Sequence, residues 1–301
     1  MARAPLTTPV ARPRSRVAAL SIASNTTLIV LKLGAALVTG SVALLTEALH
    51  SLIDLVASAV AFLSVRKAEE PADADHPYGH DKLEDLAAVI EGVFILVGSI
   101  VIAYTAASHL SSGATVDHVP VALAVLVVSI IVNLVVTRRL RRAAEATGSP
   151  ALAADASHLT ADALTSAGVL AGLLLVWITG ASWVDPVVAL IVGLVILIEG
   201  LRIVRRGSRS LIDEALPEDE LELVRVAITG HGAPVTGFHA LRARRAGATR
   251  HVDVHVQFVA GTSLEAAHVA TGIIKRRIAA ALGGQVHVLI HAEPDERVGG
   301  G

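Results

Sequence analysis

One apolar segment of the chain reads Val42-Ala-Leu-Leu-Thr-Glu-Ala-Leu-His50-Ser-Leu-Ile-Asp54-Leu-Val-Ala-Ser58, and it carries an imidazole and a carboxylate four residues apart. A second apolar segment, from Ala151 onward, repeats this pair as His158 and Asp162. On an α-helix, residues four apart project from the same face. A charge at membrane depth costs roughly 2.5–3.5 kcal/mol, so two such pairs in apolar helices indicate a functional site.

The four side chains of these pairs predict one metal site. Two imidazole nitrogens and two carboxylate oxygens form a tetrahedral N2O2 set, which suits zinc. His50 and His158 would supply neutral nitrogen, and Asp54 and Asp162 would supply anionic oxygen. A bound divalent cation would then leave the site formally neutral, which suits a low-dielectric interior. The alternative is that each pair makes a structural hydrogen bond inside a helix bundle.

The composition indicates a membrane protein. Of the 301 residues, 53% are hydrophobic and only 17% are charged, and the mean hydropathy is +0.64. A soluble chain of this length is rarely so apolar. The chain has no cysteine, so any metal site must use His, Asp and Glu. The net charge of −2 gives no bias toward nucleic acid, and we expect no nucleic-acid partner.

Six apolar stretches are long enough to cross a lipid bilayer, which takes about 20 residues each. They are residues 17–38, 42–65, 83–110, 119–140, 152–178 and 184–204. Lys and Arg lie in the N-terminal tail, in the second and fourth connections and after the sixth stretch, whereas the other three connections have none. By the positive-inside rule both termini are cytoplasmic, which an even number of crossings requires. We therefore expect a disordered basic tail over 1–16 and a six-helix domain over 17–209, placed in an inner (plasma) membrane.

The composition changes near Asp213, and residues 210–296 are typical of a small soluble domain. Pro217 and the acidic residues after it predict the start of a helix that runs to about Gly230. Two strands, a second helix and a third strand are expected at residues 235–245, 249–259, 263–282 and 285–291. The order α-β-β-α-β predicts a cytosolic α+β domain, followed by a disordered tail over 297–301.

Two further groups of histidine and acidic residues could bind metal. The connection after the second apolar stretch contains Asp73, His76 and His80, which form either a metal site or a polar turn with solvated charges. The C-terminal domain contains a larger group, which suggests metal binding if the strands bring its members together. This group consists of His239, His255, His268, His291 and Glu293.

These segments resemble the cation diffusion facilitator family over about residues 17–295. The resemblance rests on four segments, residues 40–54, 76–84, 155–166 and 211–217. It implies a homodimeric exporter of divalent metal that is driven by proton entry, with a metallochaperone-like C-terminal domain. It also implies that the three groups above are a transport site, a loop site and a cytosolic binuclear site. Lys82 and Asp213 would form an ion pair between the two protomers at the membrane–cytosol hinge.

The chain departs from the family pattern at two positions. Some bacterial members have Asp where this chain has His50, and the additional nitrogen should favour zinc over iron or manganese. Glu293 stands where some relatives have Asp, so the geometry of the cytosolic site should differ.

The sequence thus predicts a zinc–proton antiporter and not an enzyme. Imidazole titrates near neutral pH and metal binding needs deprotonated ligands, so the site would hold either zinc or protons. An intramembrane metalloprotease needs a metal-bound water and a general base, usually in a His-Glu-x-x-His motif, which the chain lacks. Two alternatives stay open: a membrane metal sensor without transport, and a transporter of Fe2+, Cd2+, Co2+ or Ni2+.

Overall fold

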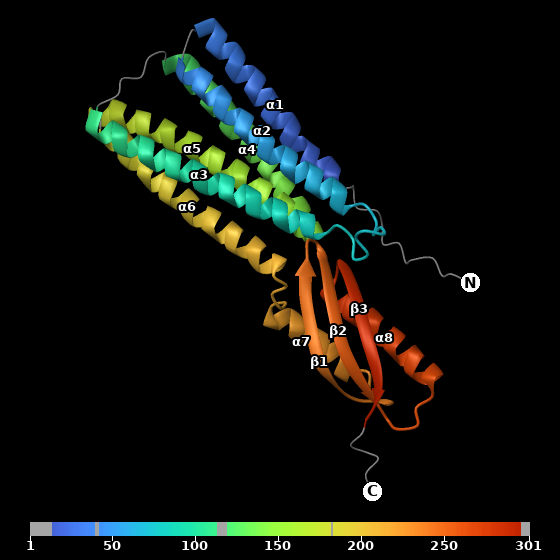
Figure 1. The fold of residues 1–301 in the computed structure, drawn as a ribbon. Helices are drawn as coiled ribbons and strands as arrows, with labels where there is room; N and C mark the ends of the chain where they lie inside the picture. Colours follow the sequence, from blue (N-terminus) through green and yellow to red (C-terminus); the bar gives the residue numbers. More distant parts are fainter. Residues whose placement is uncertain (1–13, 40–41, 113–118, 182, 296–301) are drawn as a thin grey trace. The chain divides into compact units, whose positions relative to one another are not determined.

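The computed structural model describes residues 14–39, 42–112, 119–181 and 183–295, which belong to two compact units, Met1–Ser208 and Arg209–Gly301. Six long helices dominate the first unit (Figure 1). They are α1 (Arg14–Thr39), α2 (Val42–Ala68), α3 (Lys82–Ser112), α4 (Val119–Thr147), α5 (Pro150–Thr179) and α6 (Val184–Leu211). Each contains one of the predicted apolar stretches. Most extend beyond it into flanking polar residues, because Arg, Lys and Glu are also good helix formers.

Four of the described helices, α1, α3, α4 and α6, are long and apolar enough to cross a membrane. α2 and α5 are similarly long, with 27 and 30 residues, and they carry the predicted metal ligands. A helical membrane-type unit is therefore present. Six crossings with both termini in the cytoplasm stay a prediction, and the predicted tails lie mostly outside the described residues.

Glycine residues let α3 and α6 approach each other closely. A Cβ atom added to Gly92 of α3 would lie 2.7 Å from Val204 Cγ2 of α6. A Cβ atom added to Gly207 of α6 would lie 2.7 Å from Val89 Cγ2 of α3. Small residues at such positions are typical of tightly packed membrane helices.

A buried ion pair joins the starts of α1 and α3. Arg14 Nη1 lies 2.6 Å from Glu84 Oε1, and the Ser149 hydroxyl donates to the other oxygen of Glu84. The Glu84 side chain is fully buried, whereas that of Arg14 is 10% exposed. A buried carboxylate is tolerated because it has these partners.

Replacing Arg14 by Met is expected to destabilise the helical unit by about 3–5 kcal/mol, because the charge of Glu84 would remain buried without its partner. Thermal unfolding of the purified protein in detergent, followed by circular dichroism, measures the effect. The matched control is the double variant Arg14→Met/Glu84→Met, which removes both charges and should recover most of the loss. A single variant as stable as the wild type would show that the pair does not hold the helices together.

The second unit has the predicted α-β-β-α-β order: α7 (Glu218–Thr229), β1 (Val235–Ala246), β2 (Thr249–Phe258), α8 (Leu264–Leu282) and β3 (Gln285–Pro294). The sheet has the order β1-β2-β3, with β1 antiparallel and β3 parallel to the central β2. The Ser263 hydroxyl accepts from the Ala266 N–H at 3.2 Å and caps α8.

The two faces of β2 differ, because side chains alternate along a strand. Val252, Val254 and Val256 are at most 1% exposed and belong to one core with residues of α7 and α8. His251 and His255 lie on the opposite face, which is only partly buried. This open face carries the polar residues of the sheet.

A β-bulge in β1 determines which of its residues share the open face. Phe238 and Leu241 both pack against the core although they are three residues apart. Ala240 between them has a φ of 51°, and the pairing with β2 shifts between His239 and Arg242. An extra residue in one strand reverses the alternation beyond it. His239 and Arg242 therefore lie on the same face, whereas a straight strand would separate them.

Candidate metal sites

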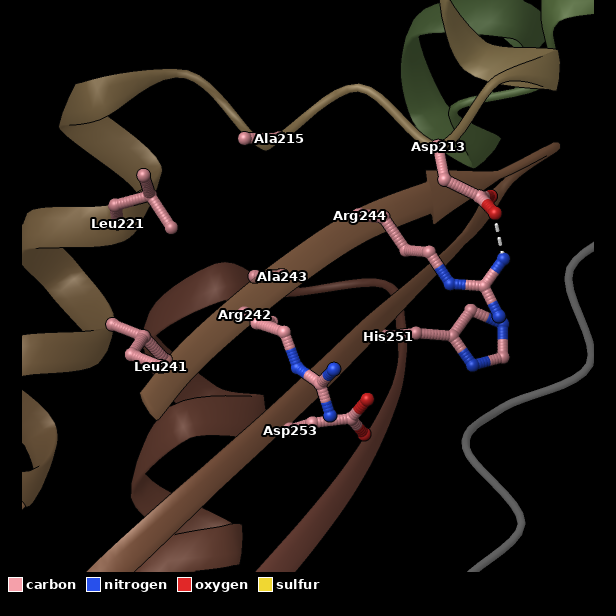
Figure 2. Close-up of a pocket in the computed structure, with 9 residues that line it drawn as sticks. All are labelled: Asp213, Ala215, Leu221, Leu241, Arg242, Ala243, Arg244, His251 and Asp253. Atoms are coloured by element: carbon pink, nitrogen blue, oxygen red, sulfur yellow. Dashed lines mark hydrogen bonds and ion pairs between the residues drawn. The ribbon is translucent and has the colours of Figure 1, made fainter. Parts of the chain in front are cut away.

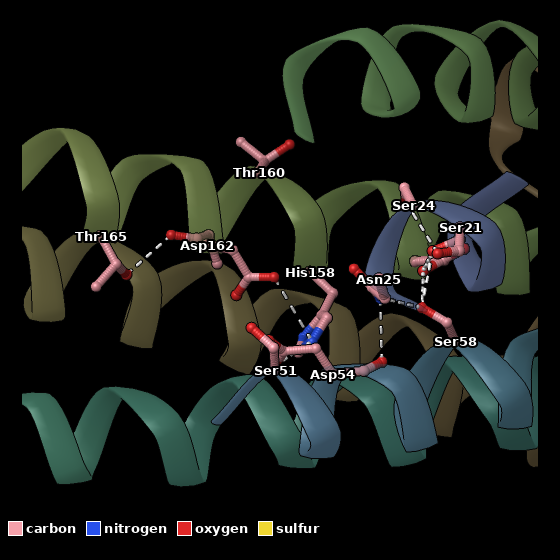
Figure 3. Close-up of polar contacts among 12 residues, drawn as sticks. Ser21, Ser24, Asn25, Ser51, Asp54, Ser58, His158, Thr160, Asp162 and Thr165 are labelled. Atoms are coloured by element: carbon pink, nitrogen blue, oxygen red, sulfur yellow. Dashed lines mark hydrogen bonds and ion pairs between the residues drawn. The ribbon is translucent and has the colours of Figure 1, made fainter. Parts of the chain in front are cut away.

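The first site lies between α2 and α5 (Figure 3). His158 Nε2 is 3.4 Å from Asp54 Oδ1 and 4.0 Å from Asp162 Oδ2. Ligand atoms of these three residues all lie within 4.8 Å of one another. Ligands about 2.0–2.2 Å from a tetrahedral zinc ion are about 3.4 Å apart, so the spacing suits one ion after small adjustments. Asp54 and His158 are each only 6% exposed, which limits competition from water.

The structure thus brings together three of the four predicted transport ligands. His158 and Asp162 share one face of α5, as their spacing predicts, and Asp54 approaches from α2. His50 lies one turn before Asp54 in α2, but its side chain is outside the described part of the chain. Its membership of the site stays a prediction.

Polar side chains of α1 support this site from one side. Asn25 donates to Ser58 Oγ at 2.8 Å and to the Asp54 carbonyl oxygen at 3.3 Å. Lys32 Nζ donates to Ser51 Oγ at 2.7 Å. These hydrogen bonds join α1 to the part of α2 that carries Asp54 and hold these two helices together there.

Sequence reasoning missed two buried carboxyl groups near this site, Asp155 of α5 and Glu91 of α3. Both residues are 0% exposed. Asp155 Oδ1 accepts from the Ser21 hydroxyl at 2.9 Å and from the Ser58 hydroxyl at 3.3 Å. The available signal was a carboxyl group inside an apolar stretch, which is a reason to suspect function.

The second site is the connection between α2 and α3. Asp73 Oδ1 lies 3.1 Å from His76 Nδ1, and Asp73 Oδ2 lies 3.2 Å from His80 Nε2. The His76 backbone N–H also donates to Asp73 at 2.7 Å, and this hydrogen bond lowers the pKa of the Asp73 carboxyl below its ordinary value. All three predicted residues therefore converge, with an ionised carboxylate between two imidazoles.

The third site lies on the open face of the sheet. His239, His255 and His291 occupy directly paired positions on β1, β2 and β3. The ring centroids are 5.0 Å apart for the first two residues and 4.7 Å apart for the last two. His239 Nε2–H donates to Glu293 Oε1, and His255 Nδ1 lies 3.3 Å from Glu293 Oε2. The hydrogen bond from His239 lowers the pKa of Glu293, so the carboxylate is ionised and available to a cation.

Three other predicted residues are not tested by these contacts. His268 is exposed on α8 and is not one of the residues that cluster around Glu293 in the described chain. Asp213 Oδ1 accepts from Arg244 Nη1 at 2.6 Å, beside a pocket that His251 also lines (Figure 2). The ion pair between protomers expected of Lys82 and Asp213 stays a prediction.

Comparison with known proteins covers both units. Residues 18–212 match the family model of the cation efflux transmembrane domain, and residues 216–295 match that of the cation efflux protein cytoplasmic domain. An uncharacterized transporter of Synechocystis is 35% identical over 291 residues, which cover 97% of this chain and 93% of the relative. Cation-efflux pumps called FieF are also similar. The one from Serratia proteamaculans is 34% identical over 92% of this chain and 91% of its own length, and the one from Escherichia fergusonii is 32% identical over 93% and 92%.

Proposed function

This chain belongs to the cation diffusion facilitator family of cation efflux transporters, and on that basis we propose that it exports zinc in exchange for protons. The observation that carries this proposal is the buried cluster of Asp54, His158 and Asp162 between two long helices. Charged groups in such a place are costly and serve an ion pathway or a proton relay. With His50 as the fourth ligand, the site would be a closed N2O2 set that suits zinc.

The exchange of zinc for protons follows from the chemistry of these ligands. Zinc binds neutral imidazole and ionised carboxylate, so its arrival displaces protons from the site. When zinc leaves, His158 lies beside two carboxylates and can take up a proton, because nearby negative charge favours the imidazolium form. The site therefore holds zinc or protons in turn, and a transporter that alternates between two sides exchanges them.

The proposal extends to the assembly and to its location. We expect a homodimer in the inner membrane, with both termini in the cytoplasm. The loop site at Asp73 and the cytosolic site at Glu293 would bind zinc on the cytoplasmic side. Zinc bound on the sheet would draw the cytosolic domains of the two protomers together and so bias the transport cycle.

The test uses proteoliposomes that contain a zinc-sensitive dye and an imposed pH gradient. Zinc should enter the vesicles as protons leave, and collapse of the gradient should slow the zinc flux. Zinc movement without proton movement would refute the antiport. Movement of iron or cobalt without zinc would refute the metal assignment, and no movement of any divalent metal would refute transport and favour a sensor.

Replacing His255 by Ala is expected to remove one zinc ion per chain from the cytosolic site while zinc flux persists, because His255 faces Glu293 and is not part of the buried cluster. Metal content after equilibrium dialysis of the full chain measures the effect. His231→Ala is the matched control, since His231 lies in the turn after α7 and its ring Nδ1 lies 3.2 Å from the Gly232 carbonyl oxygen, away from Glu293. Equal zinc content in wild type and His255→Ala would exclude a metal site on the sheet.

A further inference from the structure

Glu91 of α3 is a buried carboxyl group that the proposed zinc site does not use. The residue is 0% exposed, and neither Oε1 nor Oε2 has a hydrogen-bond partner among the described residues. Burial of an ionised carboxylate without a partner is strongly unfavourable, whereas burial of the neutral acid costs much less. Glu91 therefore needs either a proton or a nearby positive charge.

The charged groups that act on Glu91 come from α5. Asp155 and His158 both interact electrostatically with it, but no ion pair joins Glu91 to His158 in the described chain. On the side of α6, Gly92, the residue after Glu91, lies against the apolar side chains of Ile203 and Val204. On the side of α2, the relevant charge is Asp54, which lies beside His158. Glu91 therefore interacts electrostatically with His158 of the zinc site without being one of the proposed ligands.

The charge around Glu91 becomes less negative when metal binds. Without metal, the Asp155 carboxylate makes ionisation of Glu91 unfavourable, and protonated His158, which lies beside Asp54 and Asp162, offsets this only in part. A divalent cation at Asp54, His158 and Asp162 brings two positive charges and displaces the proton of His158, so the same buried region becomes more positive by one charge. The cation therefore stabilises the ionised form of Glu91. This stabilisation is larger in a low-dielectric interior than it would be in water, because Coulomb interactions increase as the dielectric constant falls.

We propose that Glu91 is a proton-binding site that releases its proton when a divalent cation binds at Asp54, His158 and Asp162, and takes it back when the cation leaves. The O–H bond of Glu91 breaks, the carboxylate keeps the electron pair, and the proton leaves by way of Asp155. Asp155 is suited to this role because Oδ2 has no hydrogen-bond partner among the described residues, while Ser21 and Ser58 hold Oδ1. Glu91 thus adds one proton to those that the ligands exchange, and the inference rests on the proposed function.

The experiment counts the protons that zinc displaces. Full-length protein in detergent is titrated with zinc chloride in a weakly buffered solution that contains a pH indicator. Glu91→Gln keeps the shape of the side chain but cannot ionise, so it should release about one proton fewer per zinc bound at the buried site than the wild type. Zinc affinity should fall by about tenfold without being abolished, because a neutral amide cannot gain the charge stabilisation that couples zinc binding to proton release. The pH dependence of zinc flux should become shallower.

Two variants make the count specific. Glu91→Asp keeps an ionisable group and should restore the wild-type proton number. Glu199→Gln is the matched control, since Glu199 of α6 is 45% exposed and pairs with Arg202 at 3.3 Å. It should match the wild type in every measurement. The same number of protons from Glu91→Gln and wild type would overturn the inference, as would complete loss of zinc binding in Glu91→Gln, which would make Glu91 a ligand or a structural residue.

A measurement on the wild type covers the case in which Glu91→Gln does not fold. Infrared difference spectra recorded with and without zinc should show loss of the C=O band of a protonated carboxyl group. Absence of this change would overturn the inference. A wild type that moves zinc but keeps the band refutes only the role of Glu91, whereas a wild type that moves no metal refutes the proposed function itself.

Discussion

Zinc flux through the Asp54→Asn variant is expected to fall by at least about 100-fold. Asn keeps the size of the side chain but removes the charge, so the site no longer neutralises a divalent cation in a buried position. Changes in the outer shell of a metal site alone cost about 10–100-fold in affinity, and loss of a ligand should cost at least as much. His158 would also lose its nearest carboxylate, which is 3.4 Å away.

Proteoliposome flux measures this loss, together with zinc binding at equilibrium. Glu199→Gln serves again as the control, because it neutralises an exposed carboxylate in another helix of the same unit. Asp54→Asn and Glu199→Gln should both elute as folded proteins in size-exclusion chromatography. A loss of flux then results from the change at the site and not from misfolding. Equal zinc flux through Asp54→Asn and wild type would show that the buried cluster is structural and that ions cross elsewhere.

Replacing His50 by Asp is expected to lower the preference for zinc over manganese by about tenfold, or about 1.4 kcal/mol. The substitution exchanges an imidazole nitrogen for a carboxylate oxygen one turn before Asp54. Imidazole suits zinc, whereas carboxylate suits manganese, so the ratio of the two fluxes should move in that direction. A change in the ratio of zinc flux to manganese flux would distinguish a metal ligand at position 50 from a residue that only lies near the ion pathway.

Competition between the two metals in one flux assay gives the ratio directly. His231→Asp introduces the same change in the second unit and should leave the ratio unaltered. A His50→Asp protein with an unchanged ratio but normal flux would remove His50 from the ligand set. The site would then have only the three ligands that the structure brings together.

The sequence predicts the helices and strands well because their signals are local. Apolar length and turn residues locate the six long helices, and the alternation in β2 locates its buried and open faces. The pairs His50 with Asp54 and His158 with Asp162 follow from helical spacing alone. That α2 and α5 bring Asp54 to His158 depends on which helices pack together, which no local pattern determines.

Two structural features are not predicted by these local sequence patterns, for different reasons. The bulge at Ala240 interrupts the alternation in β1, and the three-residue spacing of Phe238 and Leu241 was the signal that could have revealed it. Glu91 lies inside an apolar stretch of the sequence, and the structure buries it without a hydrogen-bond partner in the described chain. Burial depends on neighbours that are distant in sequence, so it becomes visible only in three dimensions.

The glycine contacts between α3 and α6 bear on how the protein is synthesised. α6 is the last of the six long helices to leave the ribosome, and α4 and α5 are made after α3 and before it. The surface of α3 around Gly92 therefore has no α6 to pack against until Val204 has been made. A nascent chain stalled before α6 would therefore leave this closely packed surface of α3 without its partner helix.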